Sequence, residues 1–103
     1  MKIYISGKMG DIPENRIRHR FKEVADYLRQ EGHVPVNPAV MLDNPGLEYE
    51  DYMSIDFSML HVCDAIYMLE GWEESEGAKR ELTYAINSGK KIIMEAPDEV
   101  SLL

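Results

Sequence analysis

Hydrophobic and polar positions follow two different periods along this chain. Short runs rich in β-branched and apolar residues occupy positions 2–6, 33–37, 65–69 and 91–94. The run AIYML at 65–69 is almost continuously apolar, as expected of a strand buried on both faces. Between these runs the apolar residues recur at helical spacing. The pattern therefore predicts four strands that alternate with three helices.

The first predicted helix opens at Asp11 and Pro13 and ends at Gly32. Asp11 is the expected N-cap, with Glu14 completing a capping box. The apolar residues of this helix are expected to form one buried stripe: Ile17, Phe21, Val24, Ala25 and Leu28.

The second helix is expected over 49–61 and the third over 76–88, and residues 38–48 are expected to form a loop. Met53, Phe57 and Leu60 should face inward from the second helix. The predicted buried stripe of the third comprises Ala78, Leu82, Ala85 and Ile86, with Glu81 at its edge. The tail from Pro97 onward is expected to hold a short turn of helix.

Strict alternation of strands and helices favours a parallel sheet, because parallel strands need crossover connections. The predicted fold is a flavodoxin- or Rossmann-like three-layer α/β sandwich with four strands in the order 2-1-3-4, forming one domain over residues 1–103. In such sheets, ligands bind beyond the carboxyl ends of the strands, where the strand order reverses. The loops at 7–11 and 71–75 should meet there.

Composition narrows the classes of function. The chain has 103 residues, 45% hydrophobic, and a formal net charge of −8. This acidity disfavours binding of a nucleic acid polymer, which depends on Lys and Arg contacts to phosphates. No apolar run is long enough to span a membrane, and no signal peptide is evident, so a cytoplasmic protein is expected. The single cysteine and three scattered histidines predict neither a disulfide nor a metal site, and no motif predicts a cofactor.

Several residues near the predicted strand ends could contact a ligand. The segment SGKMGD, which contains Ser6, Gly7, Lys8 and Met9, leads from a strand to a helix. Backbone N–H groups in such a loop often hold an anion. An ordinary tight turn is the simpler interpretation. Ser75 at the start of the third helix is a candidate phosphate contact or a plain helix cap.

Glu81 is the candidate catalytic group. Gly77 and Ala78 lie one turn before it and leave space above its carboxylate. A solvated surface glutamate is the alternative interpretation. Tyr4, Met9, Trp72 and Met94 could line an apolar slot for a base, but Tyr4 and Met94 fit a core equally well.

The sequence resembles a family of small phage or bacterial domains of unknown function related to nucleoside 2-deoxyribosyltransferases and deoxynucleotide N-glycosidases. The segments that carry the resemblance are YISGKM, NPA at 37–39 and SIDFSMLHVCDAIYMLEGWEESEGAKRE. The resemblance extends from residue 1 to about residue 94.

The resemblance implies a role for several side chains. Tyr4 matches a tyrosine near the substrate, Asp56 an aspartate that contacts the base, and Glu81 the nucleophile. Ser75 stands where the transferases have an aspartate that binds the sugar 5′-hydroxyl; the nucleotide N-glycosidases carry serine there and use it to hold the 5′-phosphate. Lys8 departs from the pattern, because proline is usual at that position.

The expected function is cleavage of a nucleoside or nucleotide N-glycosidic bond, or deoxyribosyl transfer, through the Glu81 carboxylate. The alternative is a module that binds a nucleotide without chemistry, which the acidic residues Glu73, Glu74 and Glu76 around the third helix start favour. A third interpretation is an interaction domain whose pocket is a relic. The ligand is a small molecule in the first two interpretations. Assembly into a dimer or larger homo-oligomer is also expected, since the relatives assemble around their sites.

Overall fold

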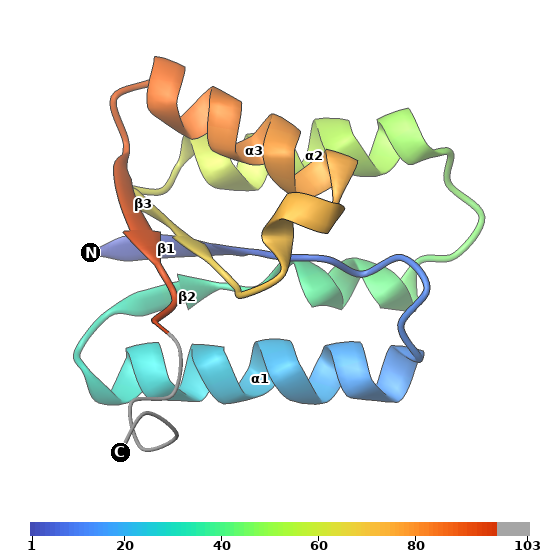
Figure 1. Cartoon of the computed structure of the whole chain (residues 1–103), viewed down its shortest axis with the longest axis horizontal. Helices are drawn as coiled ribbons and strands as arrows, with labels where there is room; N and C mark the ends of the chain where they lie inside the picture. The colour runs from blue at the N-terminus through green and yellow to red at the C-terminus, as the bar shows by residue number, and fades with distance from the viewer. Residues whose placement is uncertain (97–103) are drawn as a thin grey trace.

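The computed structural model describes residues 1–96 and places three helices around one parallel sheet (Figure 1). The strands are β1 (Lys2–Ser6), β2 (Val34–Val36), β3 (Ala65–Met68) and β4 (Lys91–Met94), in the order β2-β1-β3-β4. The helices are α1 (Glu14–Gln30), α2 (Tyr49–His61) and α3 (Glu76–Asn87), with short 3₁₀ helices η1 (Pro38–Asp43) and η2 (Trp72–Glu74). This confirms the predicted fold and strand order. The turn expected beyond Pro97 lies outside the described residues.

The sheet separates two hydrophobic clusters, one on each face. Helix α1 lies alone on one side, and α2 and α3 lie together on the other (Figure 1). Strand β1 alternates between them: Ile3 and Ile5 pack in the cluster under α1, whereas Tyr4 packs in the cluster under α2 and α3. Because Ser6 follows Tyr4 by two residues, both side chains point to the α2 and α3 side.

The predicted stripe of α1 is buried as expected, but its N-terminus differs from the prediction. The helix begins at Glu14 after Pro13, and no side chain caps it. Asp11 is not the N-cap; it takes a left-handed conformation with φ of 65°. Pro13 explains the difference, because a proline disfavours helical dihedral angles in the residue before it, and an Asp11 cap would require Ile12 to be the first helical residue. Pro13 is itself the N-cap, and its carbonyl accepts from the N–H groups of Arg16 and Ile17 at 3.0 and 3.1 Å.

Helix α2 has the predicted bounds, and its start is fixed by a capping box. Glu48 accepts from the backbone N–H of Asp51, and the Asp51 side chain accepts from the Glu48 N–H at 3.0 Å. Met53 and Leu60 are buried and Phe57 is half-buried, stacked on Tyr84. The segment expected to be a loop at 38–48 contains η1, which Asn37 caps by accepting from the Ala39 N–H at 2.9 Å.

Helix α3 begins after Ser75, as predicted, and the Ser75 hydroxyl accepts from the Ala78 N–H at 3.1 Å. Ala78 and Ala85 are buried, but Ile86 is 58% exposed and does not belong to the buried stripe. Glu81, which was expected at the edge of the stripe, is only 5% exposed and lies within the buried face together with Ala78 and Ala85. None of the helices within residues 1–96 is long and apolar enough to cross a membrane.

Candidate active site

A cavity of about 520 Å³ opens at the carboxyl end of β1, between α2, α3 and η1. This volume lies within the usual range for small-molecule sites. Predicted residues Tyr4, Gly7, Met9, Asp56, Ser75, Gly77 and Glu81 all line it. The structure therefore brings together most of the residues that the sequence marked as candidates.

Glu81 is held at the base of this cavity by two hydroxyl groups of β1. Tyr4 donates to Oε2 at 2.7 Å, and Ser6 donates to Oε1 at 2.6 Å. Both donors are fully buried, and Glu81 is nearly so. A buried carboxylate is costly unless hydrogen bonds satisfy it, so Tyr4 and Ser6 explain how this helix can point an acid at the sheet.

Glu81 and Asp56 occupy equivalent positions on their helices. Glu81 follows Ala78 by three residues and precedes Ala85 by four, and Asp56 is spaced in the same way between Met53 and Leu60. Residues at these spacings share one helix face. Each carboxyl group therefore replaces an apolar residue in a stripe that faces the sheet.

The two carboxyl groups affect each other's ionisation. Burial raises the pKa of Asp56 to about 8, and the charge of Glu81 and a hydrogen bond to it act in the same direction. Burial also raises the pKa of Glu81, whereas hydrogen bonds from Ser6, Tyr4 and Asp56 oppose that increase. We infer that Asp56 carries the proton at neutral pH and that Glu81 is the ionised member of the pair.

Tyr4 remains a proton donor throughout. Burial first, and then the charges of Glu81 and Asp56, raise its pKa well above the ordinary value for a phenol. The hydroxyl is therefore un-ionised under all ordinary conditions and always available to Glu81.

The loop after β1 approaches the sheet closely because Gly7 has no side chain. A Cβ at this position would lie 2.8 Å from Cδ1 and 2.9 Å from Cβ of Leu69. Any larger residue would displace the loop that forms one wall of the cavity.

Three predicted contacts lie outside this cavity. Lys8 pairs with Glu74 at 3.2 Å and faces a second cavity on the other side of the sheet. Trp72 packs against the hydrophobic cluster under α2 and α3 and does not line the 520 Å³ cavity. Of the four candidates for a base slot, Tyr4 and Met9 line the cavity, whereas Met94, like Trp72, does not and is 49% exposed.

The sequence prediction missed one wall of the cavity. It consists of residues from η1, the following loop and the start of α2: Pro38, Met41, Leu42, Pro45, Tyr49, Tyr52 and Met53. The capping signal of Asn37 before Pro38 and the apolar pair Met41 and Leu42 inside a polar segment were the available signs of an ordered wall.

The charge of the lining is entirely negative. Glu14, Asp56 and Glu81 contribute carboxyl groups, and no Lys, Arg or His is among the lining residues of the described chain. Within residues 1–96, no three His, Cys, Asp or Glu side chains are grouped so that they could hold a metal ion. The groups available for chemistry in the lining are thus three carboxyls, three phenols (Tyr4, Tyr49 and Tyr52), and backbone or hydroxyl donors.

A known protein family matches almost the whole chain. The family described as "domain of unknown function (DUF4406)" matches residues 1–94. No curated protein matches the chain significantly.

Two solved structures share the fold. One is a 2-desoxiribosyltransferase from Leishmania mexicana, with a TM-score of 0.71 and 26% identity over 94% of this chain and 65% of that one. The other is the CMP N-glycosidase BcmB of Clostridium botulinum, with a TM-score of 0.62 and 19% identity over 91% of this chain and 67% of that one. This chain therefore spans about two thirds of the length of each.

Proposed function

The chain belongs to the DUF4406 family, and from that premise we propose that it breaks the N-glycosidic bond of a nucleoside or a nucleoside 5′-monophosphate, passing the sugar to water or to a second base. The observation that carries the proposal is a pair of neighbouring carboxyl groups, Glu81 buried and Asp56 half-buried, at the base of a cavity sized for such a substrate. The likeness to a 2-desoxiribosyltransferase supports this class of reaction.

In the first step, a Glu81 carboxylate oxygen attacks C1′ and the bond from C1′ to the base nitrogen breaks. The electron pair of that bond leaves with the base, which takes the Asp56 proton and departs neutral. Tyr4 and Ser6 orient the Glu81 carboxylate by their hydrogen bonds. The product of this step is a glycosyl ester on Glu81, as in retaining glycosidases.

In the second step, the Asp56 carboxylate accepts a proton from water, and the water oxygen attacks C1′. The ester bond breaks, Glu81 leaves as a carboxylate, and Asp56 is again protonated. A second base that loses a proton to Asp56 would complete a transfer in the same way. Both routes return the two carboxyl groups to their starting charges.

The sugar is expected at the α3 side of the cavity. Ser75, Gly77 and the backbone N–H groups at the start of α3 face the position of its 5′ end in this proposal, and Met9 and Gly7 would border the base. Since no basic side chain lines the described cavity, a 5′-phosphate would depend on Ser75 and the helix N-terminus alone.

The decisive experiment is a chromatographic assay for free base with a panel of ribo- and deoxynucleosides and their 5′-monophosphates. Glu81→Gln keeps the shape of the side chain but removes the nucleophile, and we expect it to lower the rate by roughly 10³-fold or more. Glu31→Gln is the matched control, because it makes the same change at an exposed position at the end of α1, outside the cavity. Its rate should equal that of the wild type.

Full turnover by Glu81→Gln would refute the nucleophile. If neither the wild type nor the control released base from any substrate, while a panel member bound and was recovered intact, the chain would be a binding module. The acidic side chains of Glu73, Glu74 and Glu76 surround the start of α3 and are exposed, which is the feature that favours this second function.

A further inference from the structure

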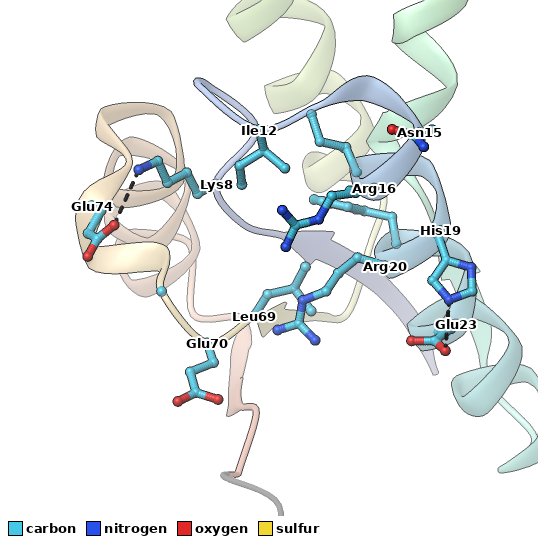
Figure 2. A pocket seen from close by; sticks show the side chains of 13 residues that line it. Lys8, Ile12, Asn15, Arg16, His19, Arg20, Glu23, Leu69, Glu70 and Glu74 are labelled. Carbon is cyan, nitrogen blue, oxygen red and sulfur yellow. Dashed lines mark hydrogen bonds and ion pairs between the residues drawn. The ribbon is translucent and has the colours of Figure 1, made fainter.

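A second cavity, of about 820 Å³, lies on the α1 face of the sheet (Figure 2). Its walls are the first half of α1, the loop after β1 and the loop after β3. Among the described residues, none lines both cavities. The loop after β1 lies between them: Gly7 and Met9 line the candidate active site, and Lys8 lines the second cavity.

Cationic side chains converge in this cavity. Arg16 and Arg20 are four residues apart and therefore share one face of α1. Figure 2 shows both side chains extending from α1 toward Leu69, with Lys8 on the opposite wall. The chain has only 11 Lys and Arg residues against 19 Asp and Glu residues, so three cationic side chains around one cavity are a notable concentration.

Arg16 takes part in no ion pair within residues 1–96, so its position in the cavity is not explained by an internal partner. Every other arginine pairs with a carboxylate, namely Arg18, Arg20, Arg29 and Arg80. Arg16 has no carboxylate within 4.0 Å among the described residues. Its guanidinium group is therefore available to a ligand.

Arg20 is held in place from outside the cavity. Its Nη2 donates to Glu95 at 2.5 Å, and the Glu95 carboxylate also accepts from the Glu70 backbone N–H at 2.9 Å. This pair uses one nitrogen of the guanidinium group, so its remaining N–H donors can still contact a ligand. A cation that is fixed before binding loses less entropy when the ligand arrives.

The remaining lining divides into an apolar floor and an acidic rim. The buried side chains of Ile17, Phe21 and Leu69 contribute the floor. Glu74 on the rim is paired with Lys8, and Figure 2 shows Glu70 pointing away from the two guanidinium groups. The carboxylates of the rim disfavour a polyanion, and the floor favours a ligand with an apolar body.

We propose that this cavity is a binding site for a small molecule that carries one phosphate or carboxylate group on an aromatic or apolar body. The anionic group lies between Arg16 and Arg20, where guanidinium N–H groups can form charge-assisted, bidentate hydrogen bonds. The apolar body lies against the partly exposed side chain of Ile12, above the buried Phe21 and Leu69. The site is independent of the N-glycosidic chemistry proposed above.

The test uses phenyl phosphate as the probe and isothermal titration calorimetry as the readout, with no turnover involved. Arg16→Gln should weaken binding by about tenfold or more, the usual consequence of losing a hydrogen bond to a charged group. Arg29→Gln removes the same charge from the last turn of α1, outside the cavity, and should change the affinity less than about twofold, since exposed charges are screened. Glu70→Gln should likewise change the affinity less than about twofold, because Glu70 points away from the two guanidinium groups.

Three further probes separate the contributions. Benzyl alcohol should not bind, because it lacks the anion, and inorganic phosphate should bind more weakly than phenyl phosphate, because it lacks the apolar body. Benzoate compared with phenyl phosphate identifies the preferred anion. Absence of phenyl phosphate binding, or equal weakening by Arg16→Gln and Arg29→Gln, would overturn the proposal. Base release by Arg16→Gln should match the wild type, so this proposal and the proposed function can fail separately.

Discussion

At the scale of single residues, the proton on Asp56 should set the alkaline limit of activity. The pKa of Asp56 is raised to about 8, so the group loses its proton as the pH rises through that value. A departing base then has no acid to protonate it, and we expect the rate of base release to fall above about pH 8. Asp56→Asn should lose this alkaline limb and lower the rate by about 10²- to 10⁴-fold, the usual contribution of a general acid. A pH–rate profile of both proteins checks this, and an unchanged alkaline limb in the variant would assign it to another group.

Because folding raises the pKa of Asp56, replacing this residue should increase the stability of the folded protein at alkaline pH. A carboxyl group whose pKa is raised by folding favours the folded state most below its unfolded pKa, and this contribution is lost as the pH rises to the folded pKa. For Asp56 the loss runs from about pH 4 to about pH 8. Asp56→Asn should therefore be more stable than the wild type at pH 9, by on the order of 1 kcal/mol after allowing for the partial exposure of the group.

Urea denaturation of both proteins at pH 5 and pH 9 measures this difference. The stability gap between variant and wild type should widen toward pH 9. A gap that stays constant, or narrows, would show that Asp56 does not titrate in this range.

The direction of a side chain is most predictable on the helices, where the spacing of apolar residues defines the buried face. Glu81 was identified at the edge of the apolar stripe of its helix, whereas Asp56 was identified only through the family resemblance, although its spacing from Met53 and Leu60 is the same signal. Lys8 and Trp72 lie in loops, where no period indicates which side of the sheet a side chain faces. Lys8 lies between Gly7 and Met9 in the chain, yet its side chain lines the second cavity, whereas Gly7 and Met9 line the candidate active site.

At the scale of elements, the start of α3 combines helix stability with the shape of the cavity. Gly77 lies in the first turn, and a Cβ there would be 3.4 Å from Sδ of Met53 and 3.5 Å from the Tyr49 hydroxyl oxygen. These contacts are tolerable, so Gly77→Ala should fold and gain about 0.5 kcal/mol from the smaller entropy loss of alanine. The added methyl group occupies space beside the proposed sugar position, and kcat/KM should fall by about tenfold, as for a difference of one methylene in a pocket.

Thr83→Ala is the matched control. It raises helix propensity on the exposed side of the same helix and does not touch the cavity. Thermal denaturation and steady-state kinetics of both variants separate the two effects. A loss of activity in Thr83→Ala as well would indicate that rigidity of α3, rather than the shape of the cavity, limits the reaction.

The elements themselves were largely predictable, and the exceptions have local causes. The bounds of α2 and β4 follow from the apolar pattern. Asp11 is not the N-cap because Pro13 disfavours helical dihedral angles at Ile12, so the helix begins only at Glu14. Ile86 is exposed because it lies beyond the helix face that Ala78 and Ala85 define. Within 38–48, the Asn37 cap indicates that a helical turn begins at Pro38, but the packing of η1 against α1 and β1 is a long-range contact that no short-range pattern reports.

At the scale of the whole molecule, two hydrophobic clusters share one sheet and should unfold together. Strands β1 and β3 are hydrogen-bonded on both sides, whereas β2 and β4 each pair with a single described strand. Ile3 and Ile66 are fully buried, in contrast to Val34 on the edge, which is 59% exposed. The site depends on this arrangement, because Tyr4 and Ser6 reach Glu81 from the central strand β1.

Amide hydrogen exchange tests how far this central pair of strands controls stability. We expect the slowest amides in β1 and β3, with an exchange free energy equal to the unfolding free energy from urea, because they open only by global unfolding. Amides of β2 and β4 should exchange faster, through local opening of the edges. If β4 amides exchanged as slowly as those of β1, a further strand would have to cover that edge, and a second copy of the chain would be the first candidate. Dilution would then speed their exchange, whereas protection by the same molecule would be independent of concentration.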